Sequence, residues 1–151
     1  MHFIANEQEF DRYSSNSILS ERTLREIYLK PFKIAIESSS PLALMTSYNL
    51  VNGVHPSERS DLIYDVLRSE WGFEGLIMSD FYMSGITGTG VSNQPSQFSV
   101  NNIAHGNNYQ LVFGGFNYFN VLDALKDGTI TKEHIYECAS KVYETIEKLY
   151  E

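Results

Sequence analysis

The sequence predicts a single α/β domain over residues 1–151, in which helices cover a parallel sheet. Short apolar runs of the buried-strand type alternate along the chain with longer segments whose apolar residues recur at helical spacing. Three such runs are clear after the N-terminal segment 2–5, whereas a closed eight-unit (β/α) barrel needs about 250 residues. The chain is therefore predicted to form a partial (β/α) barrel, about half of a closed one.

The first helix is expected after the strand-like segment 2–5. Ser20 is a favourable N-cap residue, and a single apolar face follows it, formed by Leu24, Ile27, Tyr28, Phe32, Ala35 and Ile36. Pro31 falls within this face, so the helix should kink or divide there, because proline has no N–H to donate. A strand at 42–45 then leads into the polar residues 46–49.

The second helix is predicted to start at Ser60, as its N-cap, and to stop at Gly72. Its inward residues are Leu62, Ile63, Val66, Leu67 and Trp71. A buried strand at 76–78 follows, and Asp80 stands at its end. Residues 84–102, rich in Gly, Ser, Asn, Gln and Thr, are expected to form a long surface loop.

The last part of the chain is predicted to hold one strand and two helices. The strand covers 109–113 and is closed by Gly114 and Gly115, and the helix after it ends at Gly128. Its apolar residues are Phe119, Leu122 and Leu125. A final amphipathic helix is expected to pack on the barrel through Ile135, Ala139, Val142, Ile146 and Leu149.

Composition and charge exclude several classes of partner. A net charge of −8 argues against nucleic acids and anionic membranes, because both need basic patches. No apolar run has the length of a transmembrane helix, and the N-terminus lacks the pattern of a signal peptide. Cys138 is the only cysteine, so no intrachain disulfide is possible and a reducing, cytoplasmic compartment is expected. Cys138 itself is interpreted as an apolar filler.

Polar and aromatic residues gather at the predicted strand ends. Asp80 is the strongest candidate, because barrel enzymes keep their catalytic groups at the carboxyl ends of the strands. A carboxylate, hydrogen-bond donors and aromatic faces together suit a sugar. The histidines at 2, 55, 105 and 134 show no metal-ligand spacing, and no phosphate-binding glycine loop is present. We therefore expect neither a metal nor a cofactor.

Six motifs occur in order along the chain: HF at 2–3, NEQE at 6–9, SERTLREIYL at 20–29, MTSYNLVNG at 45–53, LRSEWGFEG at 67–75 and MSD at 78–80. In order and spacing they resemble glycoside hydrolase family 3, the β-glucosidase-like family. The resemblance covers nearly the whole chain. It implies that the chain is the C-terminal half of the family's barrel, roughly its last four β/α units.

The resemblance also implies a retaining exo-glycosidase, which cleaves β-linked oligosaccharides or glucosides through a glycosyl-aspartate intermediate. On this basis Asp80 is the nucleophile. His2, Arg12, Met45, Tyr48 and Phe81 are the residues expected to contact the sugar. The Ser-Tyr-Asn motif at 47–49 and the long loop favour glucosides over hexosaminides.

The chain departs from the family pattern at several points. Met1 stands where the family has Lys, and Phe81 stands where it has Trp. The strands that hold further sugar contacts are absent, and so is the second domain that carries the acid/base Glu. The isolated chain is therefore expected to be incomplete or inactive, and its partners would be the missing barrel half and second domain, or a second copy of itself.

Simpler interpretations remain open for four of the candidates. Asp80 could cap the following turn, and His2 could be an exposed residue at the chain start. Arg12 could be a surface partner of Glu9 or Asp11, and Tyr48 a core residue with its hydroxyl on the backbone. The alternative function is a non-catalytic half-barrel that self-associates or binds sugar weakly. An aldolase is disfavoured because no predicted strand ends in a lysine.

Overall fold

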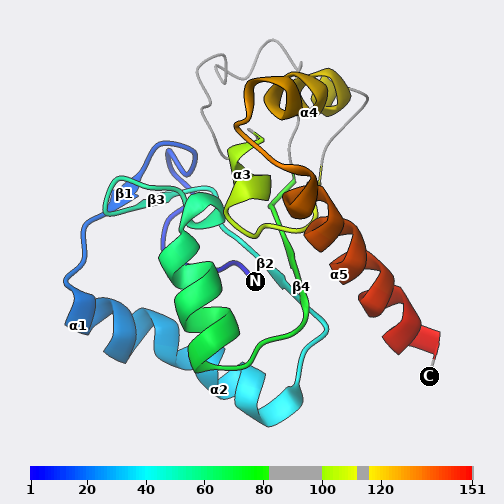
Figure 1. Ribbon diagram of the computed structural model, residues 1–151. Coiled ribbons are helices and arrows are strands. Elements are labelled where there is room, and N and C mark those ends of the chain that lie inside the picture. The colour runs from blue at the N-terminus through cyan, green and yellow to red at the C-terminus, as the bar shows by residue number, and fades with distance from the viewer. Residues whose placement is uncertain (82–99, 112–115, 151) are drawn as a thin grey trace.

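The computed structural model describes residues 1–81, 100–111 and 116–150, without the side chains of 116–120. Its elements in chain order are β1 (Asn16–Ser17), α1 (Glu21–Thr23), η1 (Leu24–Leu29), α2 (Lys30–Ser39), β2 (Ala43–Met45), β3 (Leu50–Val51), η2 (Pro56–Glu58), η3 (Asp61–Glu70), β4 (Leu76–Met78), α3 (Asn101–Ala104), α4 (Phe116–Asp127) and α5 (Lys132–Tyr150) (Figure 1). Most of the predicted glycine-rich loop, Gly114, Gly115 and the Phe119 side chain lie outside the described residues. None of the described helices is long and apolar enough to cross a membrane.

The centre of the molecule is the parallel pair β2–β4, in which Ala43 lies opposite Leu76 and Met45 opposite Met78. Single parallel bridges extend this pair on both sides, from Phe3 to Thr46 and from Met78 to Tyr109. Four parallel segments therefore lie side by side in chain order: the one at Phe3, β2, β4 and the one at Tyr109. Their carboxyl ends form one common edge. This confirms the predicted parallel arrangement. The sequence predicts a strand at 109–113. In its described residues, 109–111, only Tyr109 forms a bridge.

The first helix begins as predicted, because the Ser20 hydroxyl accepts a hydrogen bond of 3.1 Å from the Thr23 amide. The helical path then passes through the π-helical turns of η1, and a new α-helix starts beside Pro31. The predicted apolar face is wrong at Ile27, which is 61% exposed, and at Ala35, which is also exposed. The wider π-helical turns rotate the face, so that Leu29 is buried instead.

The second helix, η3, buries four of the residues predicted for its inner face: Leu62, Ile63, Val66 and Leu67. Trp71 is half-buried against the same core. The helix stops at Gly72, whose φ of 63° is left-handed, as expected of a stop residue. Ser60 is the N-cap residue as predicted, although its backbone is already helical and its side chain makes no capping bond.

One apolar cluster joins the parallel segments to these two helices. Phe3, Ile4 and Ile77 are fully buried in it, and the Phe3 and Phe32 rings meet edge to face at 5.0 Å. Burial of each such side chain contributes about 1.5–3 kcal/mol. The cluster therefore fixes the segment at 2–5, and with it His2, against α2.

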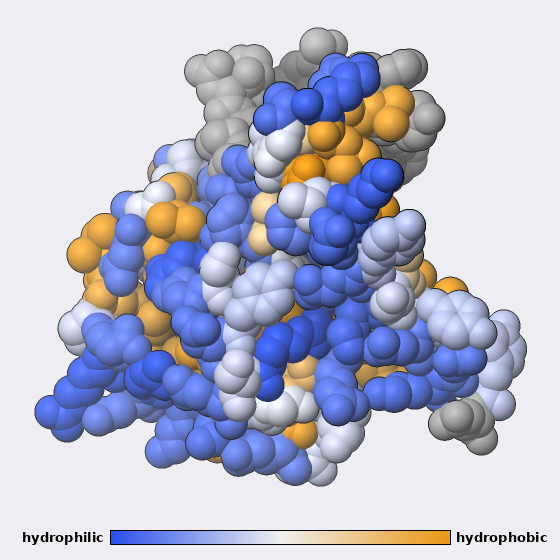
Figure 2. All heavy atoms as spheres, viewed as in Figure 1, coloured by the Kyte–Doolittle hydropathy of each residue, from blue (hydrophilic) through white to orange (hydrophobic). Residues whose placement is uncertain are grey.

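The last helix, α5, differs from the prediction. None of its residues is buried; Ile146 is 47% exposed and Leu149 66%. Its contacts with the body include hydrogen bonds between Tyr64 and Glu137, and its C-terminal half projects from the body (Figure 1). Apolar residues are also exposed beside β1 and β3 (Figure 2), where Ile18 is 75% exposed.

Candidate active site

Asp80 stands two residues after β4, at the edge where the parallel segments end. Ser79, just before it, is buried, and its amide donates to the Tyr109 carbonyl at 2.9 Å, while its hydroxyl accepts from the Leu111 amide at 3.0 Å. These bonds hold the chain at the start of the loop. The Asp80 side chain is 15% exposed, and its Oδ1 accepts from the Phe81 amide at 2.6 Å. One carboxylate oxygen thus holds the next amide, and Oδ2 is left for other partners.

His2 is a predicted site residue that lies beside the Asp80 carboxylate. Its Nε2 lies 3.3 Å from Asp80 Oδ2, so the two form an ion pair whenever the imidazole is protonated. The main chain beside His2 is fixed, because the Phe3 amide donates to the Met45 carbonyl at 2.7 Å. The Ile4 amide donates to the Ser47 hydroxyl at 2.8 Å. His2 is therefore no frayed residue, and the structure brings it together with Asp80.

Tyr48 is buried, and its hydroxyl donates to the Phe81 carbonyl. Burial, and next the negative charge of Asp80, raise the pKa of Tyr48 well above its ordinary value. The hydroxyl therefore stays protonated and remains a donor at this edge. The interpretation of Tyr48 as a core residue with its hydroxyl on the backbone is confirmed, and the expected contact with a sugar stays a prediction.

Arg12 reaches the site through Tyr48 and does not contact Asp80 in any described hydrogen bond or ion pair. Its guanidinium lies 5.0 Å from the ring centres of Tyr13 and Tyr48, a cation–π arrangement. It also donates to Glu9 at 2.8 Å, so the predicted surface ion pair is present as well. The Tyr13 and Tyr48 rings also pack edge to face, with their centres 4.8 Å apart.

The two apolar candidates lie at the same edge. Met45 is the last residue of β2 and is half-buried, opposite Met78. Phe81 follows Asp80 directly, and 40% of its surface is exposed. An exposed ring beside a carboxylate is suited to packing on the C–H face of a sugar.

His55 is a residue near the site to which sequence analysis assigned no role. Its ring is buried, and Nδ1 lies 2.8 Å from the Tyr48 carbonyl oxygen. Asn49 is also fully buried and donates to the Ile4 and Ala5 carbonyls at 3.1 Å. Pro56, directly after His55, is the sequence signal that could have drawn attention to it, because proline restricts the backbone of the residue before it.

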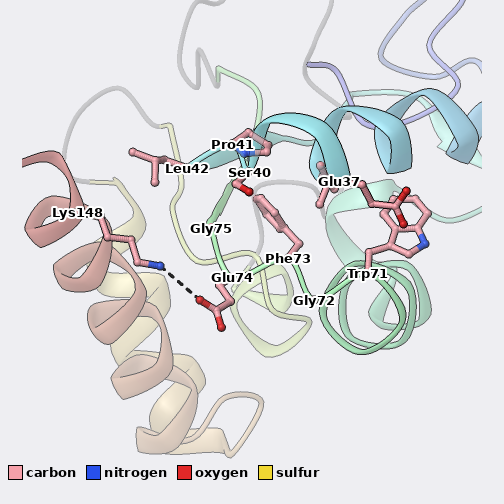
Figure 3. Close-up of a pocket in the computed structure, with 11 residues that line it drawn as sticks. Glu37, Ser40, Pro41, Leu42, Trp71, Gly72, Phe73, Glu74, Gly75 and Lys148 are labelled. Carbon is pink, nitrogen blue, oxygen red and sulfur yellow. Dashed lines mark hydrogen bonds and ion pairs between the residues drawn. The ribbon is translucent and has the colours of Figure 1, made fainter. Parts of the chain in front are cut away.

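A pocket of about 310 Å³ lies at the opposite end of the strands (Figure 3). Leu42 and Gly75, which line it, stand directly before β2 and β4, and Lys148 pairs with Glu74 at 3.5 Å beside it. Ligands of parallel α/β sheets bind beyond the carboxyl ends of the strands, so this pocket is not the candidate active site. No group of three His, Cys, Asp or Glu residues in the described part of the chain could hold a metal ion.

Comparison with known families and proteins places the geometry in context. The family described as "Glycosyl hydrolase family 3 N terminal domain" matches residues 2–145. Beta-glucosidase B of Emericella nidulans is 59% identical over 80 residues, which cover 53% of this chain and 10% of that protein. A beta-glucosidase of Kluyveromyces marxianus is 48% identical over 92 residues, which cover 61% of this chain and 11% of that protein.

Solved structures resemble the whole fold. The Kluyveromyces marxianus beta-glucosidase in complex with glucose has a TM-score of 0.82 and 35% identity, covering 97% of this chain and 17% of that chain. The Bifidobacterium adolescentis GH3 beta-glucosidase has a TM-score of 0.80 and 33% identity, covering 97% of this chain and 20% of that chain. The chain therefore spans about a tenth of the length of these curated relatives and at most a fifth of these structures.

Proposed function

The chain belongs to glycosyl hydrolase family 3, and from this premise we propose that it carries the nucleophile side of a retaining, exo-acting β-glucosidase site. The observation that carries the proposal is the position of Asp80, between His2 and Tyr48 at the carboxyl edge of the sheet. The beta-glucosidase names of the relatives support glucosides or β-linked oligosaccharides as substrates.

In the proposed reaction Asp80 Oδ2 attacks the anomeric carbon of the sugar. A carbon–oxygen bond to Asp80 forms while the bond to the leaving oxygen breaks, and that oxygen takes a proton from a second carboxylic acid. Water, deprotonated by the same second group, then releases the sugar from Asp80. We assign the second acid to no residue of this chain, in agreement with the small share of the relatives' length that it spans.

The other predicted residues have supporting roles in this proposal. His2 binds a sugar hydroxyl beside Asp80, and the Tyr48 hydroxyl holds the Phe81 carbonyl directly after Asp80. Arg12 stabilises the Tyr48 ring through its cation–π contact and places a positive charge beside it. Met45 and Phe81 offer apolar surface to the sugar. These roles need neither a metal nor an organic cofactor.

We further propose that the chain corresponds to the later half of the family's barrel, roughly its last four β/α units. Four parallel segments in chain order, with helices between them, support this placement. The missing half of the sugar site would then come from the other strands of the barrel and from a second domain.

Covalent labelling tests the proposal. A 2-deoxy-2-fluoro-β-glucosyl fluoride needs no acid assistance, because fluoride leaves unaided, so the missing proton donor does not matter. The intact mass of the purified chain should increase by one fluoroglucosyl group. The Asp80→Asn variant, of nearly the same shape, should stay unlabelled. A folded wild-type chain that takes no label would refute the claim that this chain alone holds a working nucleophile.

The second candidate function is a non-catalytic half-barrel that self-associates. The exposed apolar surface of α5 favours it, since Tyr136, Tyr143 and Ile146 are 69%, 62% and 47% exposed. These side chains recur at spacings of seven and three, which places them on one face of the helix. Apolar surface of this kind is typical of a contact with another chain or domain.

A further inference from the structure

His55 occupies an unusually well-defined position behind the candidate site. It follows the turn closed by Val51 and Val54 and precedes η2, with an extended backbone at φ −66° and ψ 137°. Pro56 favours this extended conformation, because its ring disfavours a helical residue before it. The imidazole is 2% exposed, and Nδ1 lies 2.8 Å from the carbonyl oxygen of Tyr48.

The partner of Nδ1 fixes the tautomer of the ring. A carbonyl oxygen can only accept, so Nδ1 must carry the proton, and in the neutral imidazole Nε2 keeps its lone pair. Nε2 is buried and has no hydrogen-bond partner among the described residues. An apolar side chain of similar size would fill the same space without burying an unpaired nitrogen. The bond to Tyr48 is therefore the feature of this site that requires a histidine.

Tyr48 connects His55 to the edge of the sheet where Asp80 lies. Its main chain rests on His55, its ring packs against Tyr13 under the Arg12 guanidinium, and its hydroxyl donates to the carbonyl that follows Asp80. We propose that His55 is a positioning residue, which holds the Tyr48 main chain so that the Tyr48 hydroxyl stays beside Asp80. This inference rests on the proposed function only where it concerns the reaction of Asp80.

Two substitutions separate positioning from packing. In His55→Asn the side-chain amide can stand where Nδ1 stands and donate to the Tyr48 carbonyl. In His55→Phe the volume is retained and the donor is lost, and in His55→Gln the donor moves toward the position of Nε2. His105→Phe is the matched control, because His105 Nδ1 also lies close to a backbone carbonyl, that of Asn101 at 2.6 Å, but His105 caps the end of α3.

The readouts are the titration of the Tyr48 hydroxyl and the labelling of Asp80. With ¹³Cζ-tyrosine NMR, assigned by Tyr48→Phe, the Tyr48 hydroxyl should titrate well above pH 10 in the wild type, in His55→Asn and in the control. In His55→Phe and His55→Gln it should move back toward pH 10. Labelling by the fluoroglucosyl fluoride should fall roughly 10- to 100-fold in the same two variants and stay near the wild-type rate in the others.

Each outcome decides one question. An unchanged Tyr48 titration in folded His55→Phe overturns the inference, and so does His55→Asn if it is as damaging as His55→Phe, because packing would then be the cause. If His55→Phe does not fold, the comparison of His55→Gln with His55→Asn decides instead. A wild-type chain that shows the expected Tyr48 titrations but takes no label contradicts the proposed function and leaves the positioning of Tyr48 confirmed.

Discussion

His2 Nε2 and Asp80 Oδ2 lie 3.3 Å apart, although one residue precedes the first parallel segment and the other follows the third. They meet because the parallel segments end at one common edge, and because Phe3 is paired with the neighbouring segment at 2.7 Å. This contact unites two residues that the family resemblance assigns to one sugar site.

Replacing His2 tests whether the contact serves the chemistry. Both side chains are partly exposed, so the ion pair contributes little to stability. We expect His2→Ala to unfold at nearly the wild-type urea concentration and to be labelled roughly 10- to 100-fold more slowly by the fluoroglucosyl fluoride. An equal labelling rate would show that His2 is only a neighbour of Asp80.

Arg68 should be required for stability. Its guanidinium donates to the Phe73 and Gly75 carbonyls at 2.6 and 2.7 Å and to Asn108 Oδ1 at 2.8 Å, so it ties η3 to the turn before β4 and to the next segment. Arg68→Met keeps the length of the side chain but removes the donor to the Phe73 and Gly75 carbonyls, and leaves Asn108 Oδ1 with the Ile77 amide alone. We expect a loss of about 2–4 kcal/mol in the free energy of unfolding, measured in urea. Arg22→Met, on an exposed pair, should change it by less than about 1 kcal/mol.

Gly75 is required for a steric reason. A Cβ at this position would lie 2.6 Å from the Phe73 ring and 2.7 Å from the Leu42 carbonyl oxygen, beside the pocket of Figure 3. Gly75→Ala should therefore cost about 1–3 kcal/mol of stability. A Cβ at Gly53 would have no atom within 4 Å. Gly53→Ala should therefore lower stability only by the strain of its left-handed backbone, roughly 1 kcal/mol. The prediction for Gly75 is wrong if the two variants unfold alike.

Alkaline pH should destabilise the chain through two half-buried groups. Burial, followed by the charge of Glu137, raises the pKa of Tyr64 to about 12 and that of Cys138 to about 11. In the unfolded chain these groups lose their protons near pH 10 and pH 8.5. Because the folded state holds the protons longer, its stability is complete below about pH 8.5 and falls as the pH rises toward 12. Replacing both groups, as Tyr64→Phe with Cys138→Ala, should flatten this fall in urea titrations at successive pH values.

Self-association through α5 should depend on its exposed apolar face. If the second candidate function holds, sedimentation velocity of the wild type should show association that grows with concentration, and Tyr143→Glu with Ile146→Glu should remove it. Ser38→Glu, at an exposed position of α2, is the control for the added charge. Monomeric wild-type chain at all concentrations would count against this candidate.

The sequence predicts the parallel strands and the inner face of η3 because apolar spacing is a local signal. It fails at Ile27, in the π-helical turns of η1, and at Ala35, in α2, which are both exposed. No residue type marks where such π-helical turns begin and end. It also fails for α5, since periodicity shows which face is apolar but not whether another element covers it.

The candidate site could be predicted only in part. The motifs select Asp80, His2 and Tyr48, and the structure brings these three together. The catalytic and sugar-binding roles of Asp80, His2, Arg12, Met45, Tyr48 and Phe81 stay predictions. The sequence marks His55 only through Pro56 after it, because the partner of His55 is a backbone carbonyl, and carbonyl groups leave no mark on the sequence.

The central claim, that Asp80 is a nucleophile toward sugars, is tested most directly by locating the covalent label. The chain should be incubated with 2-deoxy-2-fluoro-β-glucosyl fluoride, digested, and sequenced by tandem mass spectrometry. We expect one fluoroglucosyl group, attached to Asp80 and absent from Asp80→Asn. A label on another carboxylate, such as Glu7 or Glu9, or no label on a folded chain, would contradict the account.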